Sequence, residues 1–352
     1  MSRLCRAEVI DPHEVNVVHV INRTVRRCFL FGDDPLSGKN FDHRKDWIEE
    51  LLQHFAACFG IDLLCYSILS NHYHLILRTR PDVVDSWDET EVARRWLMIC
   101  PPRKIADKPA EPTEAELNSI RGCPVRVAEI RQRLSNVSWW MRLLNQRVAQ
   151  RANKEENEKG RFWQDRYRAI RLIDEESLVA CAAYVELNPI RAAIAATLEE
   201  SDYTSVKRRI ETERHVARGE ACSPPSQRDA FLSRVELNEA EGPIGPQPSQ
   251  SGHRCSEKGF LPMTTRQYLE LLDWTARKAV PGKRGSTPRD TPPVLKRLGL
   301  EESRWCELIR SFEETFCHVA GRTDRVSVLR SHLTGRRFRM RPSASALLPS
   351  PS

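Results

Sequence analysis

The stretch IDLLCYSILSNHYHLILR, residues 61–78, decides the fold that we expect for this chain. It holds two apolar segments, 61–69 and 72–78, with only Ser70 and Asn71 between them. A link this short is typical of a hairpin between two neighbouring strands. The stretch therefore predicts a pair of antiparallel strands.

The residues on the N-terminal side of the hairpin extend this pattern. Residues 16–22, NVVHVIN, alternate between apolar and polar positions as a half-buried strand does. A helix is expected between Asp42, a suitable N-cap, and Gly60, because apolar residues recur there at spacings of three and four. The order up to residue 80 is therefore strand, helix, strand, strand.

Regular patterns resume in the middle of the chain. Residues 138–153 predict a basic amphipathic helix, and 162–173 predict a strand with alternating basic and apolar positions. A further helix is expected from 174 to 188, because Pro189 bars its continuation. Both halves together predict one α+β domain around a mostly antiparallel sheet.

The remaining sequence differs from region to region. Prolines cluster between the two halves, where Thr113 and Glu116 predict the capping box of a short helix. Gly, Pro and Ser fill most of 242–252, and amphipathic patterns then predict helices at 264–279 and 301–320. The expected regions are a split α+β domain (1–80 and 137–215), an insertion (81–136), a linker (216–262), a mainly helical accessory region (263–341) and a disordered tail (342–352).

The composition excludes several classes of protein. The 352 residues carry a formal net charge of +7, with 40% hydrophobic and 29% charged residues, as in a globular rather than a disordered chain. No run approaches the roughly 18 apolar residues of a membrane helix, and the N-terminus lacks the apolar segment of a signal peptide. We therefore expect a cytoplasmic protein without a membrane contact.

Two histidines open the second strand of the hairpin. In His72-Tyr73-His74 the two imidazoles point to the same face, roughly 6.6 Å apart along the strand, so both can reach one metal ion. Alone, such a pair is more often incidental. Its place at the start of an apolar strand favours a function, since two buried imidazoles are a costly way to fill a core.

A second pair of candidates lies in the helix that ends at Pro189. Tyr184 and Asn188 are four residues apart and share a helical face, whereas Glu186 points elsewhere. Taken alone, Tyr184 is better read as a core aromatic and Asn188 as a C-terminal cap. Together with the histidines they form one hypothesis, in which two His and one amide oxygen hold a divalent cation beside a tyrosine hydroxyl.

Such a centre points to phosphoryl transfer. Tyrosine, with a pKa near 10, is a poor nucleophile at pH 7. It becomes effective when a metal ion polarises a phosphoryl oxygen, which indicates attack on a phosphodiester through a phosphotyrosine intermediate. The sequence holds no Walker-type glycine loop that would argue for another kind of phosphoryl transfer.

Basic and aromatic residues gather between 137 and 172, where nine Lys and Arg stand against four acidic residues. Arginines bind phosphates and aromatic rings stack on unpaired bases, so a nucleic-acid contact is favoured over a solvated helix face with core aromatics. A second basic segment, 330–341, holds five arginines and no acid, and we expect it to contact DNA as well. The candidate DNA-binding residues are Arg142, Arg147, Arg151, Arg161, Trp163, Arg166 and Arg168.

Four motifs, taken in order, resemble the signatures of the REP-associated tyrosine transposases, which are single-tyrosine (IS200-like) transposases of the HUH nuclease superfamily. The match covers about 17–80 and 137–200, somewhat over a third of the chain. The motifs are VVHVINRTVRRCFLF (17–31), YSILSNHYHLILR (66–78), GRFWQDRYRAIRLID (160–174) and YVELNPIRAAI (184–194).

The resemblance implies a ferredoxin-like α+β domain, the HUH nuclease domain, that cuts and rejoins single-stranded DNA, often at hairpins formed by palindromes. His72 and His74 fall on the metal pair of the family. Tyr184 falls on the nucleophile and Asn188 on the third, amide ligand of Mg²⁺ or Mn²⁺. The tyrosine forms a 5′-phosphotyrosine and leaves a 3′-hydroxyl in these enzymes. The insertion and the region after residue 200 lie outside the family pattern.

Two other functions stay open. A DNA-hairpin-binding protein of the same fold that no longer cuts is one alternative, although the presence of all four catalytic residue types favours the enzyme. A structural zinc site at the histidines is disfavoured, because Cys65 and Cys181 lie near the motifs without a ligand spacing. The sequence also leaves open whether the protein forms a homodimer.

Overall fold

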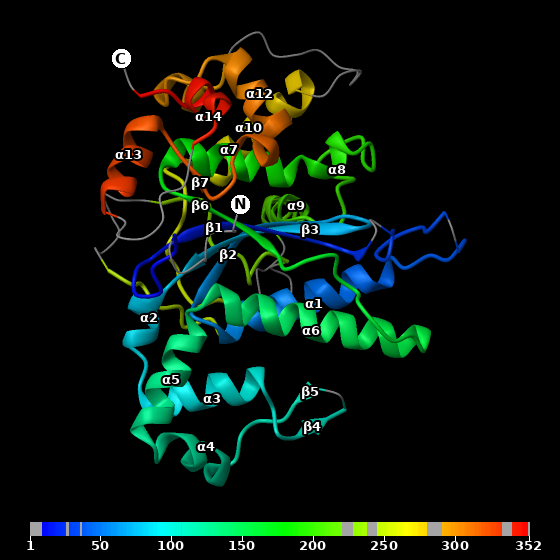
Figure 1. Ribbon diagram of the computed structural model, residues 1–352, viewed down its shortest axis with the longest axis vertical. Helices are drawn as coiled ribbons and strands as arrows, with labels where there is room; N and C mark the ends of the chain where they lie inside the picture. Colours follow the sequence, from blue (N-terminus) through cyan, green and yellow to red (C-terminus); the bar gives the residue numbers. More distant parts are fainter. Residues whose placement is uncertain are drawn as a thin grey trace.

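The computed structural model describes residues 9–25, 28–35, 37–106, 108–219, 228–237, 245–279, 291–332 and 340–350. Its centre is a five-stranded sheet in the order β2-β3-β1-β6-β7 (Figure 1). Neighbouring strands are antiparallel except β6 and β7, which are parallel. The mixed class with a mostly antiparallel sheet is as expected. The strands are β1 (Val17–Arg23), β2 (Ile61–Ile68), β3 (His72–Thr79), β6 (Arg168–Leu172) and β7 (Val319–Ala320).

The hairpin predicted from residues 61–78 forms one edge of this sheet. β2 and β3 pair antiparallel, with one irregularity between Leu63 and Cys65. The backbone N–H of Leu69 donates to the carbonyl of His72 at 2.8 Å and closes the turn. The prediction of two adjacent antiparallel strands is confirmed.

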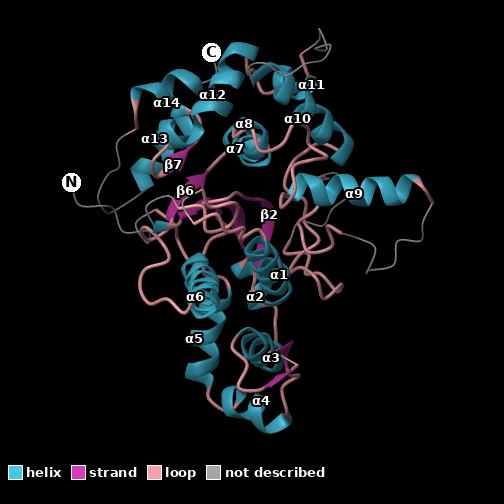
Figure 2. Cartoon of the chain, turned by 90° about the vertical axis from the view of Figure 1, so that its right-hand side faces the viewer, coloured by secondary structure: helices cyan, strands magenta, loops and turns pink. Residues whose placement is uncertain are grey.

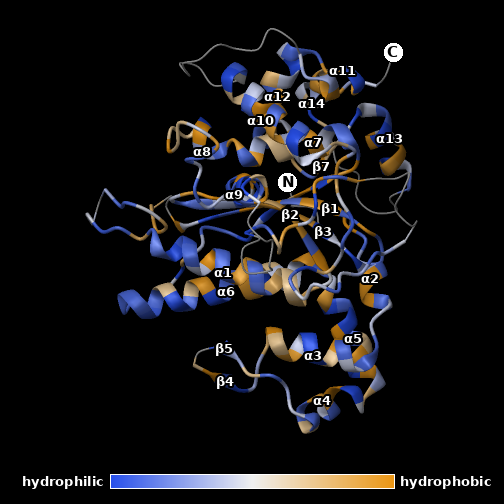
Figure 3. Cartoon of the chain, turned by 180° about the vertical axis from the view of Figure 1, so that it is seen from behind, coloured by the Kyte–Doolittle hydropathy of each residue, from blue (hydrophilic) through white to orange (hydrophobic). Residues whose placement is uncertain are grey.

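One face of the sheet is covered by two long helices. These are α1 (His43–Cys58) and α6 (Val137–Glu156), which pack against each other and against the sheet. Val18, Val20 and Tyr73 point into this layer and are fully buried. Alternate strand residues face opposite sides, so these positions give the sheet its apolar underside. Figure 3 shows the end of α6 beyond the sheet as hydrophilic.

The opposite face is covered by α7 (Glu175–Glu186) and α12 (Glu302–Thr315), with α9 (Ser205–Ala217) beside β2. Ile76 of β3 and Ile170 of β6 are fully buried in the apolar core that these helices share. The sheet is thus a layer between two layers of helices (Figure 2). Both faces carry their own apolar core.

The insertion between the two halves is itself folded. The capping box predicted at Thr113 and Glu116 is present at the start of α4. In Figure 1 the insertion extends from the α1 and α6 side of the molecule. Arg147 of α6 donates to the carbonyl of Ile99 in the insertion, which ties the two together. The elements are α2 (Pro81–Asp85), α3 (Glu89–Ile99), β4 (Lys104–Ile105), β5 (Lys108–Pro109), α4 (Glu114–Arg121) and α5 (Pro124–Leu134).

The helix expected from 174 to 188 is split in two. Asp174 caps α7, but α7 ends at Glu186, and a short helix α8 (Asn188–Arg191) follows. Pro189 stands in the first turn of α8, where its missing N–H costs no hydrogen bond. The expectation that Asn188 belongs to the same helix as Tyr184 is therefore wrong.

The strand expected at 162–173 is shorter in the structure, because β6 begins only at Arg168. The residues before it form a loop along the end of β1. The N–H of Val25 donates to the Phe162 carbonyl at 3.0 Å, and the N–H of Gln164 donates to the Arg23 carbonyl at 2.9 Å. The loop thus closes over one end of the sheet.

The region expected to be a linker is packed against the sheet. Residues 216–217 of this region end helix α9, and its parts 228–237 and 245–262 contain fully or nearly buried side chains. Arg78 of β3 donates to the carbonyls of Lys258 and Gly259 at 2.6 and 2.7 Å. Glycine, proline and serine disfavour regular elements, but they do not prevent an irregular chain from burying its apolar residues. The buried side chains include Phe231, Leu232, Val235, Cys255, Phe260 and Leu261.

The helices predicted after residue 263 form, but they are not a separate unit. They share one apolar core with α7 and the sheet, and β7 extends the sheet itself. A core that is continuous with the sheet makes this region part of the main domain. The remaining elements are α10 (Thr265–Ala279), α11 (Pro293–Arg297), α13 (Thr323–His332) and α14 (Pro342–Leu347).

The tail expected to be disordered is folded over most of its length. α14 buries Ala344 and Leu347, and Leu348 follows it into the same core. Burial of these three apolar side chains holds the stretch in place despite its low-complexity composition. The arginines of 333–339 lie outside the described residues. None of the described helices combines the length and apolar character needed to cross a membrane.

Candidate functional site

One pocket contains most of the residues that the sequence predicted for the metal ion and the tyrosine. It has a volume of about 570 Å³ and opens where β1, β3 and β6 meet α7, α8 and α12. The ring of His74 lies beside it, with centroids 5.0 Å from His72 and 5.5 Å from Tyr184. The four predicted residues therefore come together. The pocket is lined by Arg23, His72, Arg168, Tyr184, Asn188, Arg191, Arg310, Ser311, Glu313, Glu314 and Arg341.

Strand register brings the polar side chains to one face of the sheet. Arg23 of β1 lies opposite His72 of β3, and Ile21 lies opposite His74. Ile21 also lies opposite Arg168 of β6. Opposed residues in an antiparallel pair point to the same face, and so do residues two apart. All four polar side chains therefore face the layer of α7 and α12.

His19, which the sequence did not single out, is the partner of His74. Its Nε2 lies 3.0 Å from His74 Nδ1, and both rings are fully buried and stacked. Burial lowers the pKa of both imidazoles, that of His19 to about 3 with a contribution from the charge of Arg168. Both are therefore neutral at pH 7. The other nitrogen of His74, Nε2, is buried without a hydrogen-bond partner.

Tyr184 is held by aromatic and charged neighbours. Its ring packs edge-on against His74, and the guanidinium of Arg191 lies 4.4 Å from its centroid. Its hydroxyl donates to Glu313 Oε2 at 3.2 Å. Burial and then the negative charge of Glu313 raise the pKa of Tyr184 to about 12. In this state the phenol is a hydrogen-bond donor and not an activated nucleophile.

Four buried nitrogen atoms at the site lack a hydrogen-bond partner among the described residues: His19 Nδ1, His74 Nε2, Asn188 Nδ2 and Arg191 Nη1. Of these, His74 Nε2 is the one that offers a lone pair to a cation when His74 Nδ1 donates to His19. An unpaired buried polar group is costly, which suits a place that a ligand occupies. Two imidazoles and an amide oxygen form a donor set that a divalent cation accepts. His72, His74 and Asn188 therefore fit the metal ion that the sequence implied.

A zinc cluster with cysteine finds no support. Among the described residues, no group of three or more His, Cys, Asp or Glu side chains is placed to hold a metal. Cys65 and Cys181 are fully buried outside the pocket lining, and burial raises the pKa of both thiols. A thiol with a raised pKa is a poor metal ligand.

Glu313 of α12 joins the two halves of the pocket. Its carboxylate accepts hydrogen bonds from Arg23 Nη2 at 2.9 and 3.0 Å and from Arg168 Nη1 at 2.6 Å. The Tyr184 hydroxyl is its third donor. The carboxylate is only 14% exposed, whereas the arginines are 33% and 42% exposed. A nearly buried anion thus sits between two accessible cations and the tyrosine.

The predicted DNA-binding residues divide into two groups. Arg168 lines the main pocket, and Arg166 lines a neighbouring pocket of about 250 Å³ that shares Arg23 and Glu313 with it. Arg161 is exposed in the loop before β6. Arg166 and Arg168 therefore lie at the site.

The other predicted DNA contacts lie on α6 or have structural partners. Arg142 and Arg151 lie over tryptophan rings, and Arg147 is half-buried over Phe55. Trp163 donates its indole N–H to the Asn145 carbonyl at 2.9 Å. Its ring packs among other aromatics of the loop and sheet. A base would have to displace these contacts in order to stack on it.

Several residues of the site escaped the sequence analysis, among them His19, Arg23, Arg191 and Glu313. The first two lie within the motif at 17–31, where the alternation of NVVHVIN, continued to Arg23, places His19 and Arg23 on one face. That periodicity was an available signal. Glu313 lies on an ordinary amphipathic helix, and no local pattern distinguishes it.

The comparisons with known proteins identify no close relative. No family model matches the chain, and no curated protein sequence matches it. A solved structure of a REP-associated tyrosine transposase bound to a REP hairpin is similar with a TM-score of 0.34 and 12% identity, over 69% of this chain and 99% of that chain. The likeness is distant, and what this chain does has to be inferred from its own residues.

Proposed function

We propose that the protein is a metal-dependent single-strand DNA transposase or nickase. It cuts and rejoins DNA through a 5′-phosphotyrosine intermediate at hairpin or palindromic sites. The observation that carries the proposal is the shared pocket of Tyr184, His72 and Asn188, with His74 packed against the tyrosine ring. Its arginine lining suits a phosphate backbone. The resemblance of the four sequence motifs to REP-associated tyrosine transposases agrees with this function.

The strand pattern supports a ferredoxin-like arrangement for the domain. β1, β2, β3 and β6 follow one another with a helix after the first and helices before the last, and they lie in the order β2-β3-β1-β6 with antiparallel neighbours. This is the order that a β-α-β-β-α-β unit adopts in that fold. The additional strand β7 then belongs to this chain's C-terminal region.

The chemistry follows from the positions of the side chains. The Tyr184 oxygen attacks a phosphorus atom and displaces the 3′ oxygen of the preceding nucleotide, so the phenol loses a proton and the leaving oxygen gains one. His72, His74 and Asn188 would hold a divalent cation, which would supply polarisation of the phosphoryl oxygen. Arg191 over the tyrosine ring favours the phenolate. The covalent linkage keeps the bond energy for rejoining.

A single strand is the better substrate for this pocket. The Tyr184 side chain is 5% exposed, so the phosphodiester has to enter the pocket to meet it. A flexible strand can bend its backbone into the pocket, whereas paired bases hold the backbone of a duplex outside.

The second candidate is a hairpin-binding protein of the same fold that does not cut. It is favoured by one observation, the hydrogen bond from the Tyr184 hydroxyl to Glu313 together with a pKa raised to about 12. A tyrosine held in this way is not reactive until the contact opens. The two functions differ in one product, a covalent protein–DNA adduct.

The test is incubation with a hairpin-bearing single strand and Mg²⁺ or Mn²⁺, followed by denaturing electrophoresis. Wild type should give the adduct and Tyr184→Phe should give none. Tyr203→Phe is the matched control, because the Tyr203 hydroxyl bonds to Asp46 outside the pocket. His74→Ala should abolish the adduct while hairpin binding remains. Hairpin binding by wild type without any adduct would establish the second candidate.

A further inference from the structure

The Glu313 carboxylate lies at a position in the pocket that also suits a phosphate group. Two guanidinium groups and one phenol hydroxyl converge on its carboxylate within 3.2 Å. Guanidinium groups pair with carboxylates and with phosphates through the same forked geometry. The donors at this point are therefore those that a phosphodiester beside Tyr184 would use.

The contacts of Glu313 also engage the Tyr184 hydroxyl. Its carboxylate accepts hydrogen bonds from Arg23, Arg168 and the Tyr184 hydroxyl at the same time. The hydroxyl that would attack a phosphodiester is thus held by Glu313.

We propose that Arg23 and Arg168 form a binding site for the DNA phosphate next to Tyr184, and that the Glu313 carboxylate fills this site while no DNA is bound. This inference rests on the proposed function and concerns how the same site takes its substrate. The incoming phosphate exchanges places with the carboxylate. The Tyr184 hydroxyl then loses its contact with Glu313 and lies beside the bound phosphate, so substrate binding frees the nucleophile.

The exchange needs only a side-chain movement. Phe312, the neighbour of Glu313, is fully buried against Tyr184 and His19, with ring centroids 5.6 and 6.0 Å apart. Helix α12 is therefore anchored beside the tyrosine. The arginines are partly exposed, so water can solvate them during the exchange. A rotation of the Glu313 side chain opens the site while α12 stays in place.

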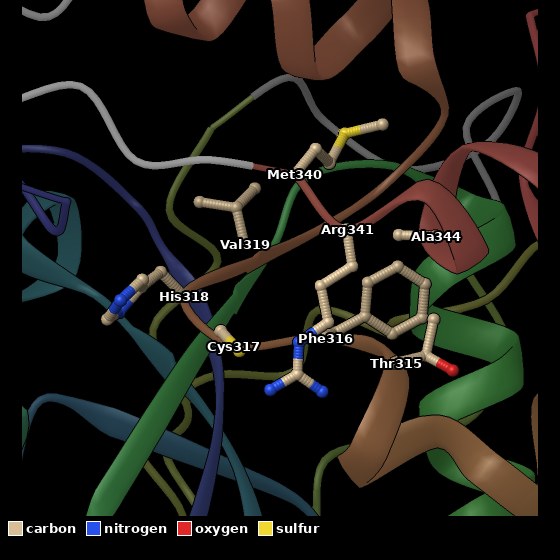
Figure 4. Close-up of a pocket in the computed structure, with 8 residues that line it drawn as sticks. All are labelled: Thr315, Phe316, Cys317, His318, Val319, Met340, Arg341 and Ala344. Carbon is tan, nitrogen blue, oxygen red and sulfur yellow. The ribbon is translucent and has the colours of Figure 1, made fainter.

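The surrounding charge favours the incoming strand. The described residues that line the pocket include five arginines and two glutamates. Arg191 stacks on Tyr184 and donates to the Arg310 carbonyl at 2.9 Å, which joins α8 to α12. Arg341 enters the lining from the segment before α14, and Figure 4 shows its side chain extending past the Phe316 ring. The C-terminal region therefore supplies part of the positive rim.

The experiment measures the affinity of a fluorescently labelled DNA hairpin with a single-stranded flank, using the full chain at several salt concentrations. Glu313→Gln removes the competing charge and should tighten binding roughly tenfold. Glu307→Gln is the matched control, because Glu307 is exposed on the same helix outside the pocket, and it should change the affinity by about twofold at most. Arg23→Ala and Arg168→Ala should weaken binding and lower the salt slope by about one each.

The rate of adduct formation at saturating DNA separates the two roles of Glu313. It should be unchanged or higher in Glu313→Gln. A fall in that rate would make Glu313 the base. Equal DNA affinities of Glu313→Gln and Glu307→Gln would show that Glu313 does not compete with DNA. Either result overturns the inference while the proposed function stands. Absence of DNA binding by every protein, wild type included, would overturn both.

Discussion

The hydrogen bond between His19 and His74 leads to a prediction about metal affinity. His19→Phe keeps a ring of similar size between His74, Tyr184 and Phe312 but removes the nitrogen that bonds His74. His74 then loses the contact that fixes its ring and the tautomer whose Nε2 can bind a metal ion. We expect the variant to fold and to bind Mn²⁺ more weakly.

The size of the effect follows from the geometry. Loss of the group that orients a metal-binding histidine lowers metal affinity by about 10- to 100-fold, which corresponds to about 1.4–2.8 kcal/mol. Both rings are fully buried, and the bond is 3.0 Å long. Water cannot take the place of the lost nitrogen in such a site, so we expect a value in the upper part of this range.

Two measurements check this prediction. The free Mn²⁺ signal in electron paramagnetic resonance reports binding directly, and the Mn²⁺ dependence of adduct formation reports it through activity. His54→Phe is the control, because His54 bonds to the Met98 carbonyl at 3.0 Å on the far side of the sheet. If His19→Phe binds Mn²⁺ no more weakly than His54→Phe, the orienting role of His19 is refuted.

Further predictions concern stability and metal dependence. Asp62→Asn should lower the free energy of unfolding in urea by about 3–5 kcal/mol, because it leaves Arg78 and Arg80 buried without their shared counter-charge. Asp82→Asn, which removes a more exposed partner of Arg80, should cost at most about 1 kcal/mol. Burial opposes ionisation of Asp62, but the charges of both arginines hold its pKa below the usual range. The contribution of Asp62 to the free energy of unfolding should therefore persist down to about pH 4 and be lost at lower pH. Acid titration of wild type against Asp62→Asn measures the difference. Thr113→Ala should cost about 1 kcal/mol in thermal unfolding, since it removes a helix cap. Removal of divalent ions with EDTA should abolish the adduct and leave hairpin binding, since the arginines need no metal to bind phosphate.

Local patterns in the sequence predicted four of the five strands of the main sheet and most of the long helices among the described residues. The strands of the hairpin, the first strand and the long helices lie within a few residues of their expected places. These elements are set by periodic burial and by caps, which act over a few residues. The wrong predictions arise because such patterns contain no information about distant segments. The composition of 242–252 predicted a linker, and its described part, 245–252, contains no helix or strand. The composition does not show, however, that the chain around this segment packs against the sheet.

The candidate site was predictable in part for a related reason. His72 and His74 are two apart on one strand, and Tyr184 and Asn188 are four apart, so each pair is visible in a short window. No short stretch of sequence shows that the two pairs meet, because their meeting depends on the register of three strands and on the packing of α7. The break before Pro189 also moved Asn188 into a second helix without removing it from the pocket.

The sequence by itself determined four strands of the main sheet, most of the long helices, the histidine pair and the basic stretch, because each is a matter of spacing along the chain. Only the tertiary structure decided which side chains share the pocket. Glu313 is 290 residues from Arg23 and reaches it because α12 buries Phe312 against the sheet face that carries His19. Apolar packing of distant segments is non-directional and depends on the shape of the whole core, so no local pattern records its result.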